Sequence, residues 1–324
     1  MDKPEHGGGT GRSREYHDGR THGHGLAEDL GAIGSRLFAR RRALAFLATA
    51  GTTAALAACG GDDGGTTNAS GSGTDTGSTS TTSSTSSSTS TSSSSSSGGT
   101  AAETCVADPS ETNGPYPADG TNTASGATSN VLTQSGIVRS DIRSSFIGST
   151  TTAAGVALAL DLQLVDVSNG CAPIAGAAIY IWQCDAYGRY SLYSSGVTTE
   201  SYLRGVQVTD ANGLVSFTTI YPACYSGRWP HIHFEVFTGG LSAASTGRTA
   251  SLISQLAMPA ATNAAVFTGD ATYTASIANY NAMSLSSDNV FGDNSSAQLA
   301  QMTPTLTGSV SAGYSGSALI GIAT

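Results

Sequence analysis

Apolar residues recur at every second position in several stretches between residues 155 and 322. In the clearest of them, from Gly155 to Val167, the apolar side chains fall on one face of an extended strand: Val156, Leu158, Leu160, Leu162 and Leu164. Residues 174–184, 232–237 and 306–322 are further extended runs, the last of them with Gly-Ser turns. Many short strands at this spacing predict an all-β fold, a β-sandwich of mostly antiparallel strands.

Two local signals refine this prediction. The runs 206–209 and 214–217 flank Asn212-Gly213, a pair that suits the positive φ of a tight turn, so we expect these runs to form a β-hairpin. A helical period is weak and confined to residues 263–267 and 296–302. The folded part of the chain is therefore expected to contain little helix.

The start of the chain follows a different pattern. Arg40-Arg41-Arg42 precede a moderately apolar run that ends in Leu56-Ala57-Ala58-Cys59. The run is too short and too weakly apolar for a membrane span, and it fits the apolar region of an export signal. The arginines resemble a twin-arginine signal, and the last four residues resemble a bacterial lipobox in which Cys59 carries the lipid. The alternative is a short amphipathic stretch in a disordered N-terminus.

Composition divides the chain at the same place. After an expected signal region over residues 1–59, residues 60–100 are almost entirely Gly, Ser and Thr, which cannot bury apolar surface and predict a disordered tether. Residues 101–324 are expected to form the folded domain. We therefore expect an exported protein with a lipid anchor at Cys59. Its domain would face outward from the bacterial membrane, in the periplasm or outside the cell.

Charge and cysteine content narrow the classes of partner. The formal net charge is −9, and after Cys59 the chain has six arginines, no lysine and seventeen Asp or Glu residues. Such a domain offers no cationic surface for phosphates, so we expect no nucleic-acid partner. Four cysteines follow Cys59: Cys105, Cys171, Cys184 and Cys224. In an exported protein an even number favours disulfides, with three possible complete pairings, over metal ligation, for which no Cys-x-x-Cys spacing is present.

The candidate chemistry is concentrated between Tyr190 and His233. His231 and His233, the only histidines of the expected domain, are two apart in an extended run, so both imidazoles point to one face and can bind one metal ion. Arg228 and Tyr225 lie just before them, and Tyr190 lies in a glycine-marked turn upstream. Because a phenol with a pKa of about 10 must lose its proton to bind well, a hard trivalent cation such as Fe(III) suits this donor set better than zinc.

Several motifs follow one another along the domain: Trp182-Gln183-Cys184-Asp185-Ala186-Tyr187-Gly188-Arg189-Tyr190-Ser191, Leu203-Arg204-Gly205-Val206-Gln207, Ile220-Tyr221-Pro222-Ala223-Cys224-Tyr225 and Arg228-Trp229-Pro230-His231-Ile232-His233. Together with Thr112-Asn113-Gly114-Pro115-Tyr116 and Ser254-Gln255-Leu256, they resemble the intradiol ring-cleavage dioxygenases, the family of catechol 1,2- and protocatechuate 3,4-dioxygenases. The resemblance runs from about Gly114 to Ile322 and is closest to the exported branch of this family.

The resemblance implies a function and a set of site residues. It implies one Fe(III) per domain with four protein ligands: Tyr190, Tyr225, His231 and His233. A catechol-type diol would react with O2 between its two hydroxylated carbons and give a cis,cis-muconate-type diacid. Arg228 would stabilise the charge that develops on the substrate, and Tyr225 would leave the metal and accept a proton. Three residues are expected to contact the substrate: Pro115, Tyr116 and Gln255.

The chain also departs from the family pattern. Asn113 stands where an acidic residue is common, Gln183 stands where histidine is common, and Gln255 lies farther from the histidine pair than in the cytosolic enzymes. The tether stands in place of the helical dimerisation region of the catechol enzymes, so a monomer is favoured. Six arginines do not make a carboxylate clamp evident, which favours catechol, hydroxyquinol or lignin-derived diols over protocatechuate.

Two functions of other classes stay open on the sequence. A non-catalytic, tethered β-sandwich that binds a surface partner would hold no iron and would leave the Tyr, Arg and His arrangement without a role. A metalloenzyme that uses only the histidine pair, with zinc or copper, would keep its metal and its activity when Tyr190 or Tyr225 is replaced by Phe.

Overall fold

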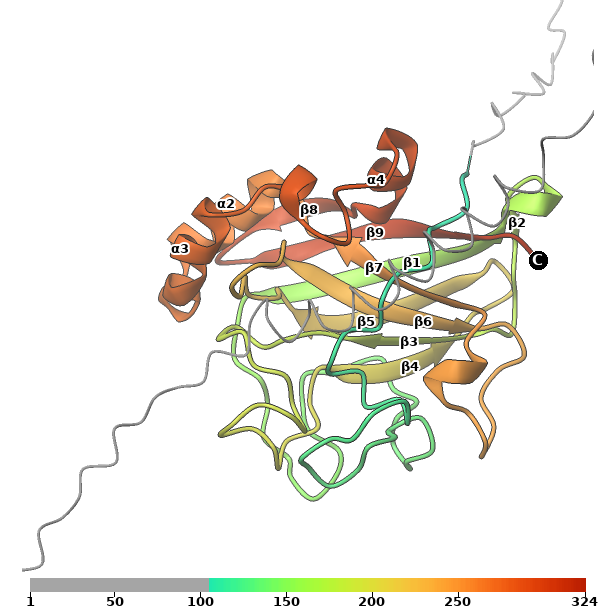
Figure 1. Cartoon of the computed structure of the whole chain (residues 1–324), viewed down its shortest axis with the longest axis horizontal. Coiled ribbons are helices and arrows are strands. Elements are labelled where there is room, and N and C mark those ends of the chain that lie inside the picture. The colour runs from blue at the N-terminus through green and yellow to red at the C-terminus, as the bar shows by residue number, and fades with distance from the viewer. Residues whose placement is uncertain (1–104) are drawn as a thin grey trace, which may run out of the picture. The chain divides into compact units, whose positions relative to one another are not determined.

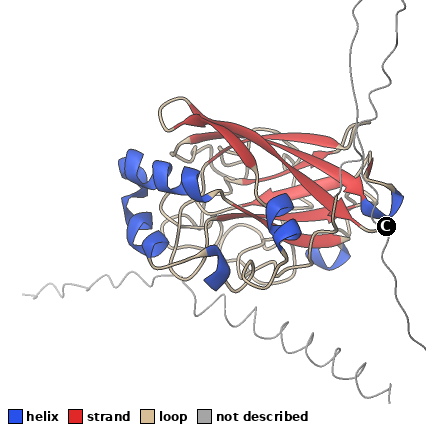
Figure 2. Ribbon diagram, turned by 90° about the horizontal axis from the view of Figure 1, so that it is seen from above, coloured by secondary structure: helices blue, strands red, loops and turns tan. Residues whose placement is uncertain are grey.

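The computed structural model describes residues 105–324, which form two β-sheets with the helices at their periphery (Figures 1 and 2). The strands are β1 (Ala157–Asp166), β2 (Ala172–Pro173), β3 (Ala178–Trp182), β4 (Arg204–Val208), β5 (Leu214–Ile220), β6 (His231–Phe237), β7 (Leu252–Ala257), β8 (Thr305–Ser309) and β9 (Gly313–Ile322). The α-helices are α2 (Ala260–Gly269), α3 (Thr274–Asn281) and α4 (Ser296–Met302), and the 3-10 helices are η1 (Val167–Asn169), η2 (Gly247–Thr249), η3 (Ala271–Tyr273) and η4 (Leu285–Ser287). The predicted β-sandwich is confirmed.

Strand β1 organises the first sheet. It pairs in parallel with β9 on one edge and antiparallel with β5 and then β2 on the other, and β8 extends the sheet beyond β9. The second sheet has the order β4-β3-β6-β7 and is antiparallel throughout. Strand β6 therefore has a hydrogen-bonded neighbour on each edge (Figure 1), so the positions of its side chains are fixed from both sides.

The alternation in the sequence becomes the burial pattern of the strands. The leucines predicted to share one face of β1 are at most 1% exposed: Leu158, Leu160, Leu162 and Leu164. In the second sheet Ile181 of β3 lies opposite Phe234 of β6, and both belong to the same hydrophobic cluster as these leucines. Because side chains alternate along a strand, the other face of β6 is left for His231 and His233.

The hairpin predicted around Asn212-Gly213 is wrong. β4 pairs with β3 in the second sheet, whereas β5 pairs with β1 in the first. The turn itself forms, with Gly213 at φ 71° and the N–H of Asp210 donating to the carbonyl of Leu214 at 3.0 Å. Longer ladders decide the pairing, since seven residue pairs join β5 to β1 and five join β4 to β3. The turn thus carries the chain from one sheet to the other.

The helical part of the chain was only partly visible in the sequence. Helices α2 and α4 cover the two weak helical periods, whereas α3 has no such period. The segment that includes η4 and α4 packs around a small apolar cluster separate from the main core: Trp229, Ala257, Val290, Phe291 and Met302. This cluster brings residues 288–302 against the start of β6.

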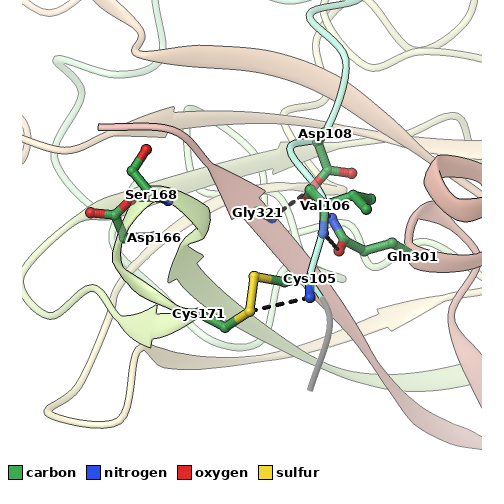
Figure 3. The surroundings of a disulfide bond; sticks show 8 residues. All are labelled: Cys105, Val106, Asp108, Asp166, Ser168, Cys171, Gln301 and Gly321. Carbon is green, nitrogen blue, oxygen red and sulfur yellow. Dashed lines mark hydrogen bonds between the residues drawn. A yellow bond between two sulfur atoms is a disulfide. The ribbon is translucent and has the colours of Figure 1, made fainter. Parts of the chain in front are cut away.

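The cysteines form one disulfide. Cys105 and Cys171 are bonded, with Cα atoms 5.9 Å apart (Figure 3). Cys184 and Cys224 are buried free thiols, so the complete pairing expected from the sequence does not form. The sulfur of Cys184 contacts the carbonyl of Ala223 at 3.7 Å, and that of Cys224 contacts the carbonyl of Arg228 at 3.4 Å. Each thiol is thus engaged with main-chain oxygen instead of the other thiol.

Part of the predicted organisation lies outside the described residues. This holds for the signal region over residues 1–59 with Cys59, and for the tether over residues 60–100. The folded domain, predicted from residue 101, is described from Cys105 onward. Within residues 105–324 no helix combines the length and the apolar character that a membrane crossing requires.

Candidate metal centre

Strand β6 presents both predicted histidines on one face. His231 and His233 are each 2% exposed, and their Nε2 atoms are 3.0 Å apart. The Nδ1–H of His231 donates to the carbonyl of Trp229 at 2.6 Å, which leaves the Nε2 lone pair for a metal ion. The histidine pair inferred from the spacing of two therefore forms as expected.

The ring of His233 is oriented by stacking. Trp182 of β3 lies directly opposite His233 in the sheet, and the two rings are 4.7 Å apart at an angle of 7°. Tyr180 stacks on the other side of Trp182, with ring centroids 4.9 Å apart. Among the described residues the Nδ1 atom of His233 has no hydrogen-bond partner. Flat contact with Trp182 thus takes the place of the hydrogen bond that usually orients a ligand histidine.

The two tyrosines reach the histidines from separate loops. Tyr190 follows a tight turn after β3, in which the N–H of Gly188 donates to the carbonyl of Asp185 at 3.0 Å and Gly188 has φ 79°. Tyr225 lies in the connection between β5 and β6. A Cβ atom at Gly188 would lie 3.3 Å from the Cβ of Tyr225. The two loops therefore pack against each other, and a glycine lets them approach.

The four predicted donor atoms converge. The hydroxyl of Tyr190 lies 3.4 Å from Nε2 of His231 and 3.3 Å from Nε2 of His233, and the hydroxyl of Tyr225 lies 3.3 Å from Nε2 of His231. Donors bonded to one transition-metal ion at about 2.0–2.1 Å, with angles of about 90–110° between them, are about 2.9–3.4 Å apart. The observed separations fall in this range, so the four side chains fit a single metal ion.

The chemistry of the donor set favours one kind of metal ion over others. Among residues 105–324 no three His, Cys, Asp or Glu side chains gather as they would around an ion, so a metal at this place needs the tyrosine oxygens. Two phenolates and two imidazoles favour a hard trivalent cation, because such a cation displaces the phenol protons most readily.

Both histidines are neutral. Burial is the main reason that the pKa of His231 falls to about 3, and the charge of Arg228 lowers it further, while the hydrogen bond to Trp229 acts in the opposite direction. Burial and the neighbouring His231 lower the pKa of His233 well below its ordinary value. At neutral pH both imidazoles therefore keep a lone pair for a metal ion.

Arg228 lies beside this cluster and is almost completely buried. Its Nε donates to the carboxylate of Asp288 at 3.0 Å, and its Nη2 donates to the side-chain oxygen of Gln255 at 2.7 Å. The other end of the Gln255 amide donates to the carbonyl of Thr112 at 2.9 Å. The sequence resemblance predicts that Gln255 lies near the site. It reaches Arg228 because the register of β7 against β6 sets Gln255 opposite His233.

The other two predicted substrate residues lie on the neighbouring loop. The ring of Tyr116 is 4.9 Å from that of Tyr190 and 5.3 Å from that of Tyr193. Both Tyr116 and Pro115 are partly exposed, and the carbonyl of Pro115 accepts a hydrogen bond from the amide of Asn122 at 2.6 Å. This loop therefore borders the metal centre on the Tyr190 side.

Two residues that support the site were not predicted from the sequence. Arg204, fully buried, donates to the carbonyls of Tyr116 and Ser191, each at 2.9 Å, and so ties the Tyr116 loop to the segment that carries Tyr190. Asp288 binds Arg228 from a segment 60 residues downstream. Arg204 lies within one of the motifs that resemble the family, and this motif could have indicated a role in the site. Nothing in the sequence around Asp288 distinguishes it from the other acidic residues.

Part of the chain matches a known protein family. Residues 140–247 match the family model described as a dioxygenase. No curated protein matches the chain. The match confirms the resemblance to the dioxygenases, and with it the interpretation of the chain as an enzyme of the oxidoreductase class.

Solved structures that resemble the chain include three dioxygenases. An intradiol ring-cleavage dioxygenase from Tetranychus urticae has 25% identity and a TM-score of 0.49, with 68% of this chain and 95% of that chain covered. The dioxygenase domain of a dioxygenase and carbohydrate-binding fusion from Streptomyces sp. SirexAA-E has 20% identity and a TM-score of 0.40, with 68% and 99% covered. The 3-chlorocatechol 1,2-dioxygenase from Rhodococcus opacus 1CP has 19% identity and a TM-score of 0.41, with 68% and 74% covered. At these TM-scores the likenesses do not decide the function.

Proposed function

We propose that the domain is an Fe(III)-dependent intradiol dioxygenase, which cleaves a catechol-type diol with O2 between the two hydroxylated carbons and yields a cis,cis-muconate-type diacid. The observation that carries the proposal is the convergence of two phenol oxygens and two imidazole nitrogens. The two histidine nitrogens, Tyr190 with each of them, and Tyr225 with His231 make four pairs of donor atoms that lie 3.0–3.4 Å apart. Bound by these four side chains, Fe(III) would act as a Lewis acid that activates the diol toward O2.

Tyr225 is the ligand best placed to exchange with substrate. It is 9% exposed, whereas Tyr190 is 1% exposed and the histidines are 2% exposed. Tyr190 is also covered by the ring of Tyr116, 4.9 Å away. We therefore assign to Tyr225 the role of the phenolate that gives up its position and takes a proton from the incoming diol, while Tyr190 stays in place.

Arg228 supplies a fixed positive charge beside the reacting atoms. It lies three residues from Tyr225 and three from His231, and its charge lowers the pKa of both histidines. A buried and pre-oriented cation stabilises developing negative charge without reorganisation. Removal of one such group typically lowers kcat by about 10²–10³-fold. We expect this loss for Arg228→Ala.

The arginines favour a diol without a carboxylate substituent. Arg139 donates to main-chain carbonyls, Arg143 pairs with Asp141, and Arg189 pairs with Asp185. Arg204 donates to the carbonyls of Tyr116 and Ser191, and Arg228 donates to the side chains of Asp288 and Gln255. These five cations are engaged within the protein, and the sixth, Arg248, lies exposed in η2. Catechol, hydroxyquinol or a lignin-derived diol is therefore a better candidate than protocatechuate. Pro115, Tyr116 and Gln255 would border the bound ring.

The cellular setting is part of the same proposal. We assign residues 1–59 to a twin-arginine-type signal that ends in a lipobox at Cys59, and residues 60–100 to a tether. The enzyme would then be exported, anchored by lipid at Cys59 and monomeric. Support comes from the agreement between adjacent segments, because a Gly, Ser and Thr tether after a lipidated cysteine would hold a catalytic domain away from the membrane.

A visible absorption spectrum of the iron-loaded protein tests the proposal. Tyrosinate bound to Fe(III) is expected to give a charge-transfer band, which should shift when catechol is added without oxygen and decay when oxygen is admitted. Oxygen uptake with a panel of diols would then define the substrate. A colourless protein that binds iron no better than its His231→Ala variant would exclude the proposal and favour the tethered binding domain.

Tyrosine variants separate this proposal from a zinc or copper enzyme built on the histidine pair. Tyr190→Phe should lose most bound iron and the absorption band, because it removes one of two phenolate donors. Tyr187→Phe is a matched control, since Tyr187 lies in the same turn but is 56% exposed. Full metal content and activity in Tyr190→Phe would favour the histidine-pair enzyme.

A further inference from the structure

Asp288 is a buried carboxylate that the proposed chemistry does not use directly. It follows η4, in the segment that packs on the small apolar cluster, and both its side chain and that of Arg228 are 0% exposed. One oxygen accepts from Nε of Arg228 at 3.0 Å and from the N–H of Trp229 at 2.7 Å. The other accepts from the N–H groups of Val290 and Phe291 at 2.8 and 3.1 Å. Main-chain N–H groups therefore hold the carboxylate in place independently of its contact with Arg228.

Arg228 is held from two sides as a result. Asp288 binds Nε and, at 3.4 Å, Nη2, which defines one edge of the planar guanidinium group. Gln255 accepts from Nη2 at 2.7 Å on the other side and is itself anchored to Thr112. A guanidinium group with two fixed acceptors has one orientation, because its donors form a rigid planar fork.

The pair also stays charged despite its burial. Burial by itself would raise the pKa of Asp288, but the charge of Arg228 and the main-chain N–H groups of Trp229 and Val290 outweigh it, so the pKa of Asp288 lies below its ordinary value. The negative charge of Asp288 compensates the buried positive charge of Arg228, which can therefore remain a cation away from solvent.

We propose that Asp288 is a positioning residue, which orients the Arg228 guanidinium toward the metal centre and so makes the turn after η4 part of the active site. This inference rests on the proposed dioxygenase function for its catalytic consequence, whereas the geometric link between Asp288 and Arg228 can be tested without it. The catalytic effect proposed for Asp288 passes through Arg228, because its carboxylate binds that side chain directly.

A purely structural role for Asp288 has different consequences. The same carboxylate accepts from Val290 and Phe291 and so also supports the turn after η4. If that were its only role, its replacement would lower stability but would leave kcat unchanged in the molecules that fold. The loss of stability on replacing Asp288 would also be the same whether or not Arg228 is present.

A double-mutant cycle separates the two roles. Asp288→Asn, Arg228→Ala and the double variant would be compared in the iron-loaded full chain, with the exposed Asp293→Asn as a matched control. We expect Asp288→Asn to lower kcat by about 10–100-fold with a change in KM below about threefold, since charge on the transition state is affected more than binding. In the Arg228→Ala background the same change should lower kcat less than about twofold, because coupled residues are not additive.

Guanidinium ion provides a second measurement. In Arg228→Ala the free ion can occupy the space beside Asp288, and we expect it to restore kcat by at least about tenfold, because a buried carboxylate attracts it. In the double variant the ion should restore nothing. Equal rescue in both variants, or additive losses in the cycle, would overturn the proposal.

The Nε–H resonance of Arg228 in the metal-free full chain tests the geometry independently of iron and activity. It is identified by its absence from Arg228→Lys, and its exchange with solvent should be slow in the wild type and fast in Asp288→Asn. A resonance unaffected by Asp288→Asn would refute the positioning role. If Asp288→Asn does not fold, Asp288→Ser, which keeps one acceptor in a smaller volume, carries the same test.

The dioxygenase function and the geometric link can fail separately. A wild type without catechol-dependent oxygen uptake, but with slow exchange of the Arg228 resonance, would refute the dioxygenase function and leave the link between Asp288 and Arg228 standing.

Discussion

Asp108 should make the stability of the domain depend on pH in a defined direction. Its carboxyl group is buried, and one oxygen accepts both from the N–H of Gly321 at 2.7 Å and from the amide of Gln301 at 2.9 Å (Figure 3). The other oxygen has no hydrogen-bond partner among the described residues. Burial raises the pKa of Asp108 from 3.8 to about 7, although these two hydrogen bonds lower it.

The magnitude follows from this difference in pKa. Below pH 3.8 the carboxyl group is protonated in both the folded and the unfolded chain, so its ionisation does not lower the free energy of unfolding. Between pH 3.8 and about 7 the unfolded chain ionises and the folded chain does not, so stability falls as pH rises. Above about pH 7 the loss is complete, and at about 1.36 kcal/mol per pKa unit it amounts to about 4 kcal/mol.

Asp108→Asn removes this loss because the amide imitates the protonated acid. Its oxygen can accept from Gly321 and Gln301, and it does not ionise. Urea unfolding would be measured for the variant, the wild type and the control Asp293→Asn at about pH 4 and about pH 8. The free energy of unfolding of Asp108→Asn relative to wild type should rise by up to about 4 kcal/mol between these pH values. An equal difference at both pH values would refute the reasoning.

Two further outcomes follow from the packing. Burial raises the pKa of Cys224 to about 12 and that of Cys184 above its ordinary range. Neither thiol should therefore react with an alkylating reagent in the native protein at about pH 8, whereas both should react after unfolding. Peptide mass mapping would locate the modified cysteines. Rapid native modification would contradict their enclosure. A Cβ atom at Gly247 would lie 1.8 Å from a carboxylate oxygen of buried Asp119, so Gly247→Ala should lower the free energy of unfolding by about 1–3 kcal/mol. Gly239→Ala, which meets nothing within 4 Å, is the control, and equal effects of the two would count against this contact.

The four candidate metal ligands were the residues of the site most readily proposed from the sequence. His231 and His233 needed only the two-residue period of a strand, and the structure places their nitrogens 3.0 Å apart. Tyr190 and Tyr225 came from ordered motifs and from the chemistry of the donor set, and both hydroxyls reach the histidines. Local spacing, residue chemistry and the motif resemblance were enough to propose these residues, because each is carried by a short segment.

Sheet pairing was less predictable because it is decided between distant segments. Asn212-Gly213 does form a turn, but the flanking strands pair with β3 and β1 instead of with each other. The same holds for the cysteines, where Cys105 reaches Cys171 across 66 residues and the other two thiols contact main-chain oxygens. Turn chemistry and cysteine number set what is possible locally, and packing selects among the alternatives.

The sequence by itself determined the β class, the faces of the strands and the identity of the four candidate ligands, because these depend on backbone periodicity and on the chemistry of single side chains. Only the tertiary structure decided what surrounds Arg228. Gln255 reaches it through the register of β7 against β6. Asp288 reaches it because a small apolar cluster holds the segment that includes η4 and α4 against the start of β6. Contacts of this kind join residues far apart in the chain, and their partners are chosen by burial and hydrogen bonding in three dimensions, which no local pattern records.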